Sequence, residues 1–272
     1  MELLKISPII NLPFLYDYFF YYSSEKAPLG SVVEINLHNR KCFGLVLKVD
    51  PLLKMKKIIK ESNYPLKKIN QVILDFPVIN YSLLKVAKFL SLYYYCSLPL
   101  ALKTIFPSNL KSFFNFLKKE KPTTFPSLAK KEPKKENEIN INFLEITSLK
   151  NLKEKINSFF DNQVLFLAPT YFHLLYFKNI FPQGVIFQKK DGKKNFKIFK
   201  EILEGKPLLI LGTRSAVFLP FQNLKAVIVV EPENVNYKSY QQKPFYNAAR
   251  IAQKLAFYHQ SELIFFPYES QN

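Results

Sequence analysis

The sequence predicts an α/β protein made of two domains, and two observations support this. Short aromatic-rich and β-branched segments dominate residues 1–107, which favours a small β-rich, barrel-like domain of α+β type. Continuous apolar runs alternate with helical stretches over residues 139–272, which favours a layered sheet of parallel strands. Residues 108–138 are predicted to be a linker, because Lys, Glu and Pro leave few large apolar side chains to bury there.

The first domain contains a predicted hairpin. Residues 31–37 partly alternate as a half-buried strand should, residues 38–41 are a polar turn, and residues 42–49 return as the next strand. A further short strand is expected over residues 67–79. Residues 80–98 carry apolar side chains at helical spacing, so we expect a helix there.

The second domain contains four apolar runs that are typical of buried parallel strands. The predicted strands are residues 164–170, 208–213, 226–231 and 263–266. The predicted helices are residues 151–160, 171–180, 195–204 and 244–259. Strands that alternate with helices in this way predict an α/β layered architecture.

The chain is strongly basic, with 39 Lys and Arg against 21 Asp and Glu, a formal net charge of +18. This charge fits a polyanionic partner, most simply nucleic acid. A second explanation stays open, because only Arg40, Arg214 and Arg250 are arginines and the remaining basic residues are lysines with AT-rich codons. The excess is spread along the chain, so a basic tail does not explain it.

Several function classes are not expected. Two cysteines, Cys42 and Cys96, exclude a disulfide framework and a cysteine-rich zinc module within these residues. The three histidines lack metal-binding spacing, so no metal site is predicted. No apolar run reaches membrane-spanning length and the N-terminus does not resemble a signal peptide, so we expect a cytoplasmic protein without a membrane partner.

Polar residues follow the predicted parallel strands, where open sheets bind ligands. In a nucleotide-driven motor, an acidic pair at the third strand would hold Mg²⁺ and position the attacking water. Glu231 and Glu233 stand there, separated by Pro232. The alternative is that both are surface carboxylates, which we favour because the sequence has no G-x-x-x-x-G-K-[ST] phosphate loop. No catalytic residue is therefore predicted.

Three blocks of residues carry a family resemblance. The first is Tyr16-Asp17-Tyr18, then Gly30-x-x-Val33-x-Ile35, then residues 36–40 and Gly44-x-Val46. The second runs from Lys67 through residues 74–78 and 93–96 to Phe106-Pro107. The third is Gly212-Thr213-Arg214-Ser215-Ala216-x-Phe218-x-Pro220-Phe221-x-Asn223-Leu224. These blocks resemble the primosomal protein N′ (PriA) family of replication-restart helicases, and the third matches almost letter for letter.

The resemblance implies that residues 1–107 form a domain that binds the 3′ end of DNA. It places Tyr16, Asp17, His38 and Lys67 at the binding pocket and makes Arg40 a further DNA-binding residue. Tyr16 would stack on the terminal base, the Asp17 carboxylate would accept a hydrogen bond from the 3′-hydroxyl, and Lys67 would pair with a phosphate. The alternatives are a core aromatic for Tyr16 and a solvated charge for Lys67. His38 stands where the family has glycine.

The resemblance also implies a RecA-like helicase lobe in residues 139–272. Members of the family use ATP, Mg²⁺ and structural Zn, whereas here the phosphate-loop region, residues 144–151, has no glycine. The family's D-E-E-H motif is Glu231-Pro232-Glu233-Asn234, and its S-A-T-type motif falls at residues 266–270. We therefore expect a degenerate lobe without cofactors.

The turn that follows the second strand of this lobe carries three further candidate residues. Thr213, Arg214 and Ser215 are expected to contact the DNA backbone through their hydroxyls and guanidinium. The alternative is a purely structural turn between a strand and a helix.

The sequence as a whole thus predicts DNA binding in replication restart or repair, at branched DNA with a 3′ end, without ATPase activity. One alternative is a protein-interaction subunit for primosome assembly. Another is an ATP-dependent 3′–5′ helicase component that a second chain completes.

Overall fold

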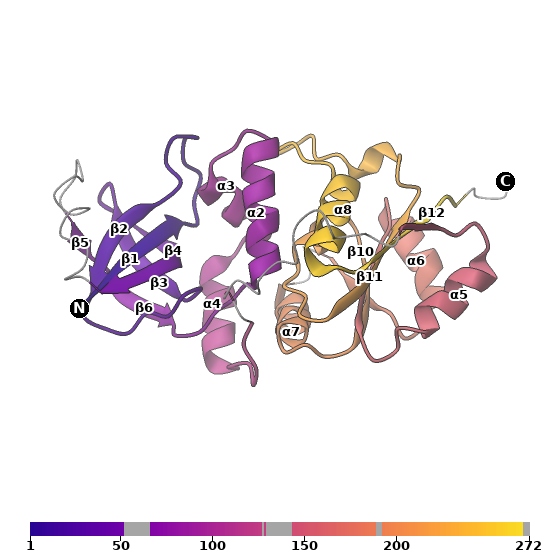
Figure 1. Cartoon of the computed structure of the whole chain (residues 1–272), viewed down its shortest axis with the longest axis horizontal. Coiled ribbons are helices and arrows are strands. Elements are labelled where there is room, and N and C mark those ends of the chain that lie inside the picture. The colour runs from indigo at the N-terminus through magenta and orange to yellow at the C-terminus, as the bar shows by residue number, and fades with distance from the viewer. Residues whose placement is uncertain (52–65, 127, 129–142, 189–191, 269–272) are drawn as a thin grey trace. The chain divides into compact units, whose positions relative to one another are not determined.

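A computed structural model describes residues 1–51, 66–126, 128, 143–188 and 192–268 of the chain. The chain divides into two compact units. Unit 1 consists of Met1–Asn80 and Ala87–Leu128, and unit 2 consists of Tyr81–Val86 and Ala129–Asn272. Each unit is built around its own sheet (Figure 1).

Unit 1 contains a six-stranded sheet in the order β5-β2-β1-β4-β3-β6. Its strands are β1 (Glu2–Pro8), β2 (Phe19–Ser23), β3 (Val32–Leu37), β4 (Arg40–Pro51), β5 (Lys67–Lys68) and β6 (Gln71–Leu74). Neighbouring strands are antiparallel except for β5, which runs parallel to β2. The predicted hairpin is therefore present as β3 and β4.

One segment, residues 67–74, touches both edges of this sheet. Its β5 part pairs with β2, where the Ile69 N–H donates to the Tyr22 carbonyl at 3.1 Å. Its β6 part pairs with β3, where the Asn70 N–H donates to the Glu34 carbonyl at 2.8 Å. Because this segment pairs with strands at both ends of the sheet order, the sheet is curled into a barrel-like form. Its apolar interior includes Ile69 and Tyr21.

The helices of unit 1 follow the sheet. They are α2 (Tyr81–Tyr93), whose first residues belong to unit 2, then α3 (Leu98–Ile105) and α4 (Leu110–Lys119). Ser97 caps α3 by accepting a hydrogen bond from the Leu100 N–H. Asn109 caps α4 in the same way through the Ser112 N–H, at 3.1 Å.

Part of the segment that we expected to be a linker, residues 108–138, is folded, because it contains helix α4. Phe113, Phe114 and Leu117 recur at helical spacing and are fully buried, and the Phe114 ring packs edge-on against Phe43 of β4. The lysine-rich composition hid this apolar stripe, because the lysines occupy the opposite, exposed face. Residues 127 and 129–138 of the predicted linker lie outside the described residues.

Unit 2 contains a six-stranded, all-parallel sheet in the order β7-β12-β11-β8-β10-β9. Its strands are β7 (Phe143–Glu145), β8 (Gln163–Leu167), β9 (Val185–Phe187), β10 (Leu208–Gly212), β11 (Leu224–Val230) and β12 (Glu262–Phe266). The four predicted strands are β8, β10, β11 and β12. Sequence reasoning missed β7 and β9, which are three-residue edge strands with too few residues to show a pattern.

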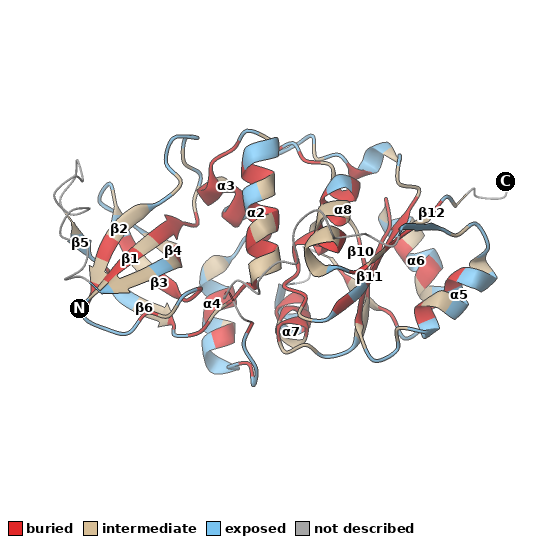
Figure 2. Cartoon of the chain, in the orientation of Figure 1, coloured by how far each residue is buried: buried red, intermediate tan, exposed pale blue. Residues whose placement is uncertain are grey.

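Helices cover both faces of the parallel sheet. They are α5 (Leu149–Asn157), α6 (Tyr171–Ile180), α7 (Gly192–Leu203) and α8 (Ala248–His259), with short 3-10 helices η3 (Arg214–Phe218) and η4 (Val235–Tyr237). Buried side chains of α5 and α6 join one face of β8, β11 and β12 in a single apolar cluster. Helix α8 packs on β11 from the other face (Figure 2). The predicted fold class, a β-rich barrel-like domain and a RecA-like α/β lobe, is confirmed.

Candidate nucleic-acid interface

Tyr16 and Asp17 lie on the loop that joins β1 to β2. The Tyr16 ring is half exposed and stacks on Phe19 of β2, with the ring centroids 6.0 Å apart and an interplanar angle of 13°. Tyr16 is therefore not a core aromatic, which was the alternative for this residue. A ring held by stacking on one face keeps its other side available for a planar ligand.

Asp17 has a fixed carboxylate. Its Oδ1 accepts a hydrogen bond from the backbone N–H of Leu98, the first residue of α3, at 2.9 Å, and its own carbonyl accepts one from the Ser7 hydroxyl at 2.7 Å. A helix N-terminus stabilises a carboxylate through its free N–H groups and its dipole. Asp17 therefore also joins its loop to α3, a role that the sequence did not predict.

Cys96 lies beside this carboxylate. Burial, and after it the negative charge of Asp17, raises the pKa of the Cys96 thiol to about 11. Burial and the charge of Glu34 raise the pKa of Cys42 to about 11 as well. Both thiols stay protonated at neutral pH, which suits packing residues rather than nucleophiles.

His38 occupies the two-residue turn between β3 and β4. His38 has φ 46° and Asn39 has φ 61°, so both residues are left-handed, as a type I′ hairpin turn requires. Asparagine and glycine suit these positions, whereas a larger side chain is disfavoured there. His38 therefore carries backbone strain at this turn.

We expect His38→Gly to stabilise unit 1. The left-handed region costs a residue with a Cβ roughly 1–2 kcal/mol, and the greater freedom of glycine in the unfolded chain offsets part of this, so a net gain of about 0.5–1 kcal/mol is expected. Denaturant unfolding of both proteins measures it. Asn39→Ala is the control and should lower stability, since it adds strain at the adjacent left-handed residue. A less stable His38→Gly would contradict the strain at this turn.

Lys67 and Arg40 are both exposed at strand ends. Lys67 begins β5 and pairs with Tyr21 of β2, whereas Arg40 begins β4 immediately after the turn. The Tyr21 hydroxyl donates a hydrogen bond to the Asn36 carbonyl at 2.9 Å, two residues before His38. This hydrogen bond therefore links β2, which pairs with β5 at Lys67, to β3, which leads into the turn at His38.

No hydrogen bond or ion pair joins the side chains of Tyr16, Asp17, His38 and Lys67 within the described part of the chain. Tyr16 and Asp17 precede β2, Lys67 pairs with that strand, and His38 lies on a turn connected to it through Tyr21. Their convergence on one nucleotide remains a prediction.

The Gly212–Ala216 turn follows β10 in unit 2. A Cβ on Gly212 would lie 2.2 Å from the Cβ of Ala216, so the turn can close only with glycine at this position. The Arg214 guanidinium donates to the Lys238 carbonyl, and Thr213, the residue that precedes η3, makes no side-chain capping hydrogen bond. The Gly and Ala of this block therefore have a structural role, whereas Thr213, Arg214 and Ser215 are partly exposed and remain candidates for phosphate contact.

Glu231 lies directly after β11, and its carboxylate is engaged on both oxygens. Its Oε1 lies 3.2 Å from Nε2 of His173, and its Oε2 accepts a hydrogen bond from the Asn234 side chain at 2.7 Å. Nδ1 of His173 is in turn 2.7 Å from the hydroxyl of Thr170, which caps α6. Glu231 has φ 47°, a left-handed conformation that this network holds. Glu233 is exposed.

The contact of His173 with Glu231 was not predicted, because only histidine spacings typical of metal sites were considered. The signal was Thr170-x-x-His173 at the start of a helix that follows a buried strand. Such a histidine lies at the carboxyl edge of the sheet, where it can meet the residue after the neighbouring strand.

The region expected to hold the phosphate loop joins β7 to α5 through residues 146–148. The Ile146 N–H donates to the Phe265 carbonyl at 3.0 Å and so continues the pairing with β12. Ser148, the residue that precedes α5, makes no side-chain capping hydrogen bond. This short connection contrasts with the glycine-rich loops whose N–H groups surround a triphosphate. The expected S-A-T-type motif lies partly outside the described residues, at 269 and 270.

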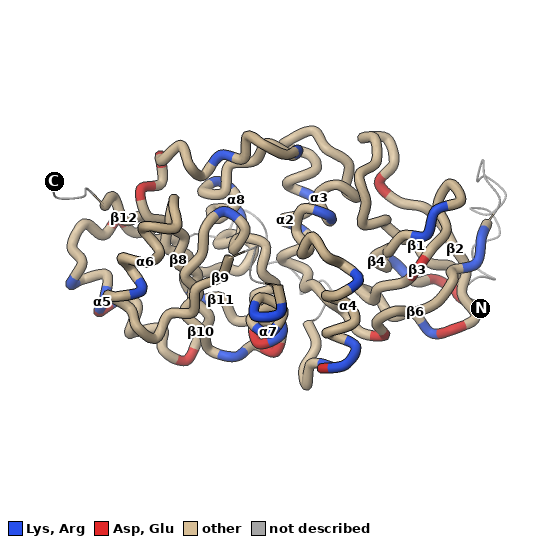
Figure 3. Tube along the Cα trace, turned by 180° about the vertical axis from the view of Figure 1, so that it is seen from behind, with Lys and Arg blue, Asp and Glu red and all other residues tan. Residues whose placement is uncertain are grey.

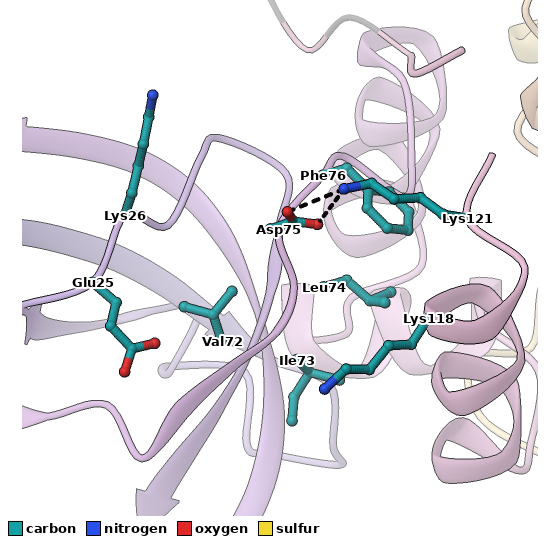
Figure 4. A pocket seen from close by; sticks show the side chains of 9 residues that line it. All are labelled: Glu25, Lys26, Val72, Ile73, Leu74, Asp75, Phe76, Lys118 and Lys121. Atoms are coloured by element: carbon teal, nitrogen blue, oxygen red, sulfur yellow. Dashed lines mark hydrogen bonds and ion pairs between the residues drawn. The ribbon is translucent and has the colours of Figure 1, made fainter. Parts of the chain in front are cut away.

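A cavity of about 380 Å³ lies elsewhere in unit 1, between β6, the residues after β2 and the end of α4 (Figure 4). Lys121 pairs with both oxygens of Asp75, at 3.0 and 3.1 Å, and the Lys118 side chain extends over Ile73. None of the residues predicted to bind DNA lines this cavity. Its two carboxylates and three lysines give it only a small net charge, so we do not assign it to the interface.

Basic residues are spread over both units, on α4, on α7 and around β1 and β2 (Figure 3). In the described part of the chain, no helix is long and apolar enough to cross a membrane. Within those residues, no group of three or more His, Cys, Asp or Glu side chains is placed to hold a metal ion.

The N-terminal part of the chain is similar to known proteins. Residues 6–107 match the family model for the 3′ DNA-binding domain (3′BD) of PriA. The chain is PriA-like in this N-terminal part. It is 40% identical over 73 residues to the replication restart protein PriA of Helicobacter pylori strain J99, which covers 26% of this chain and 12% of that protein.

Two further PriA proteins are similar over comparable lengths. The PriA of Synechocystis is 35% identical over 74 residues, or 27% of this chain and 9% of that protein. The PriA of Chlamydia pneumoniae is 32% identical over 69 residues, or 25% of this chain and 9% of that protein. The matched stretches are thus a small fraction of each PriA, and the loop that carries Tyr16 and Asp17 lies within the residues that the family model covers.

Proposed function

We propose that this protein binds DNA at a free 3′ end, in the cytoplasm, as part of replication restart. The observation that supports this most is the loop of Tyr16 and Asp17, within residues that match a 3′ DNA-binding domain. The Tyr16 ring is half exposed and stacks on Phe19, and among the described residues the Asp17 carboxylate accepts a hydrogen bond through Oδ1 alone, from the Leu98 N–H. The second oxygen is available to accept a hydrogen bond from a ribose hydroxyl.

The same carboxylate provides selectivity. A 3′-hydroxyl can donate a hydrogen bond to Asp17, whereas a 3′-phosphate would bring negative charge against it. Lys67 on β5 and Arg40 on β4 supply cations for the backbone phosphates that precede the end. Binding is therefore expected to weaken as salt rises.

We further propose that unit 2 binds DNA without hydrolysing ATP. Glu231 stands where a motor would place the carboxylate that holds Mg²⁺, and His173 and Asn234 engage both of its oxygens. The connection of residues 146–148 offers no glycine-rich loop for phosphates. Thr213, Arg214 and Ser215 would contact the DNA backbone at the end of β10.

Purified protein is expected to hydrolyse ATP no faster than a protein-free blank, with or without fork DNA. The measurement is phosphate release with excess Mg²⁺, and Glu231→Gln is the control for any trace activity. DNA-stimulated hydrolysis that Glu231→Gln abolishes would contradict the proposal and support a working motor.

A further inference from the structure

The turn that ends α2 contains a residue with a strained backbone, Tyr95, which has no part in the proposed binding of a 3′ end. The Cys96 N–H donates to the Ser91 carbonyl at 3.0 Å, which closes the helix in a Schellman-type turn. Tyr95 occupies the left-handed position of this turn, with φ 49°. Glycine is usual there, since a bulky side chain is disfavoured in that conformation. A tyrosine kept in a strained position suggests a role for its side chain.

The Tyr95 side chain contributes little to packing, because it is 85% exposed. Tyr93, two residues earlier, is also exposed. On the neighbouring loop, Phe14 and Tyr16 are half exposed. Exposed aromatic rings in such number are unusual for a surface that faces only water.

Two hydrogen bonds tie Tyr95's segment to the loop of Tyr16 and Asp17. The Ser97 hydroxyl donates to the Leu12 carbonyl at 2.7 Å, and the Leu98 N–H donates to Asp17 Oδ1 at 2.9 Å. Tyr95 precedes Leu98 by three residues, so their Cα atoms are at most about 11 Å apart. All of these residues belong to unit 1.

We propose that Tyr95 forms a second stacking site, which binds an unpaired base a short distance upstream of the terminal nucleotide. The proposal rests on the proposed binding of a 3′ end at Tyr16 and Asp17. Aromatic rings fit bases because every base presents a π-face, so the contact does not depend on DNA sequence. The chain as a whole carries a formal charge of +18, which favours a polyanionic partner.

The test uses single-stranded oligonucleotides that carry the fluorescent base 2-aminopurine at the first, second, third or fourth position from a 3′-hydroxyl end. Three variants of the full chain are compared with wild type. Tyr95→Gly removes the ring, Tyr95→Phe keeps it, and Gln260→Gly is the matched control. Gln260 occupies the left-handed end of α8, with φ 55°, in unit 2.

Stability and binding are expected to change in opposite directions in Tyr95→Gly. This variant should melt at or above the wild-type temperature, because it removes a left-handed tyrosine, as should Gln260→Gly. Tyr95→Gly should nevertheless bind the oligonucleotides about tenfold more weakly and lose the stacking signal upstream of the terminal base. Tyr95→Phe and Gln260→Gly should bind as wild type does.

The outcomes separate this inference from the function on which it rests. Wild-type affinity and an unchanged upstream signal in Tyr95→Gly would overturn the second stacking site while end binding stands. A wild-type protein that does not bind the oligonucleotides would overturn the proposed function itself, and the second site with it. A lower melting temperature in Tyr95→Gly would instead show that the ring serves packing.

Discussion

Gly212→Ala is expected to destabilise unit 2 strongly. The new Cβ would lie 2.2 Å from the Cβ of Ala216, which is fully buried in η3, so the turn after β10 must open or the helix must shift. Overpacking of a well-packed interior costs roughly 1–3 kcal/mol, and this overlap is severe enough to place the cost at the upper end. Thermal unfolding followed by circular dichroism measures the loss.

Two controls make this result specific. Gly192→Ala adds a Cβ with no atom within 4 Å, but at a backbone φ of 29°, so it measures backbone strain without overlap and should cost less than Gly212→Ala. Ala216→Gly in the Gly212→Ala background removes the overlapping methyl and should restore part of the stability. If Gly212→Ala unfolds as wild type does, the glycine of this block has no structural role, and a direct role at the DNA would become the better explanation for the whole block.

Asp17→Ala is expected to destabilise unit 1 and to weaken DNA end binding together. It removes the acceptor of the Leu98 N–H at the start of α3, and losing such a charged hydrogen bond at a helix N-terminus costs about 1–2 kcal/mol. It also removes the proposed acceptor for the 3′-hydroxyl. Denaturant unfolding and fluorescence anisotropy of labelled DNA measure the two effects.

Asp17→Asn separates these two roles. The amide oxygen can still accept from the Leu98 N–H, so stability should stay closer to wild type than in Asp17→Ala. The negative charge is lost, so the preference for a 3′-hydroxyl over a 3′-phosphate should fall. An Asp17→Asn variant that keeps the full preference would contradict the role of the Asp17 charge in selectivity.

The apolar patterns predicted most of the architecture. The runs that became β8, β10, β11 and β12 are long enough to show that they are buried, and the β3–β4 hairpin has alternating strands around a polar turn. The sequence could not show that residues 67–74 connect both edges of one sheet, because closure depends on which distant strands meet. It also concealed α4, whose buried Phe113 and Phe114 stand among lysines.

The candidate site was predicted less completely. Tyr16 and Asp17 were found through a motif, but the hydrogen bond from Leu98 joins residues far apart in the chain and has no local signal. The strain at His38 and Tyr95 comes from their positive φ angles, which the sequence alone does not give. Glu231 was identified from its place after a strand, whereas its contact with His173 depends on the order of strands in the sheet.

The loop of Tyr16 and Asp17 is the proposed binding site for a free 3′ end. The most direct test compares wild-type binding to two fork DNAs that differ only in a 3′-hydroxyl or a 3′-phosphate on the same strand, at fixed salt. We expect the 3′-hydroxyl fork to bind at least several-fold more tightly, since a phosphate would meet the Asp17 carboxylate. Equal affinity for the two forks would contradict the account.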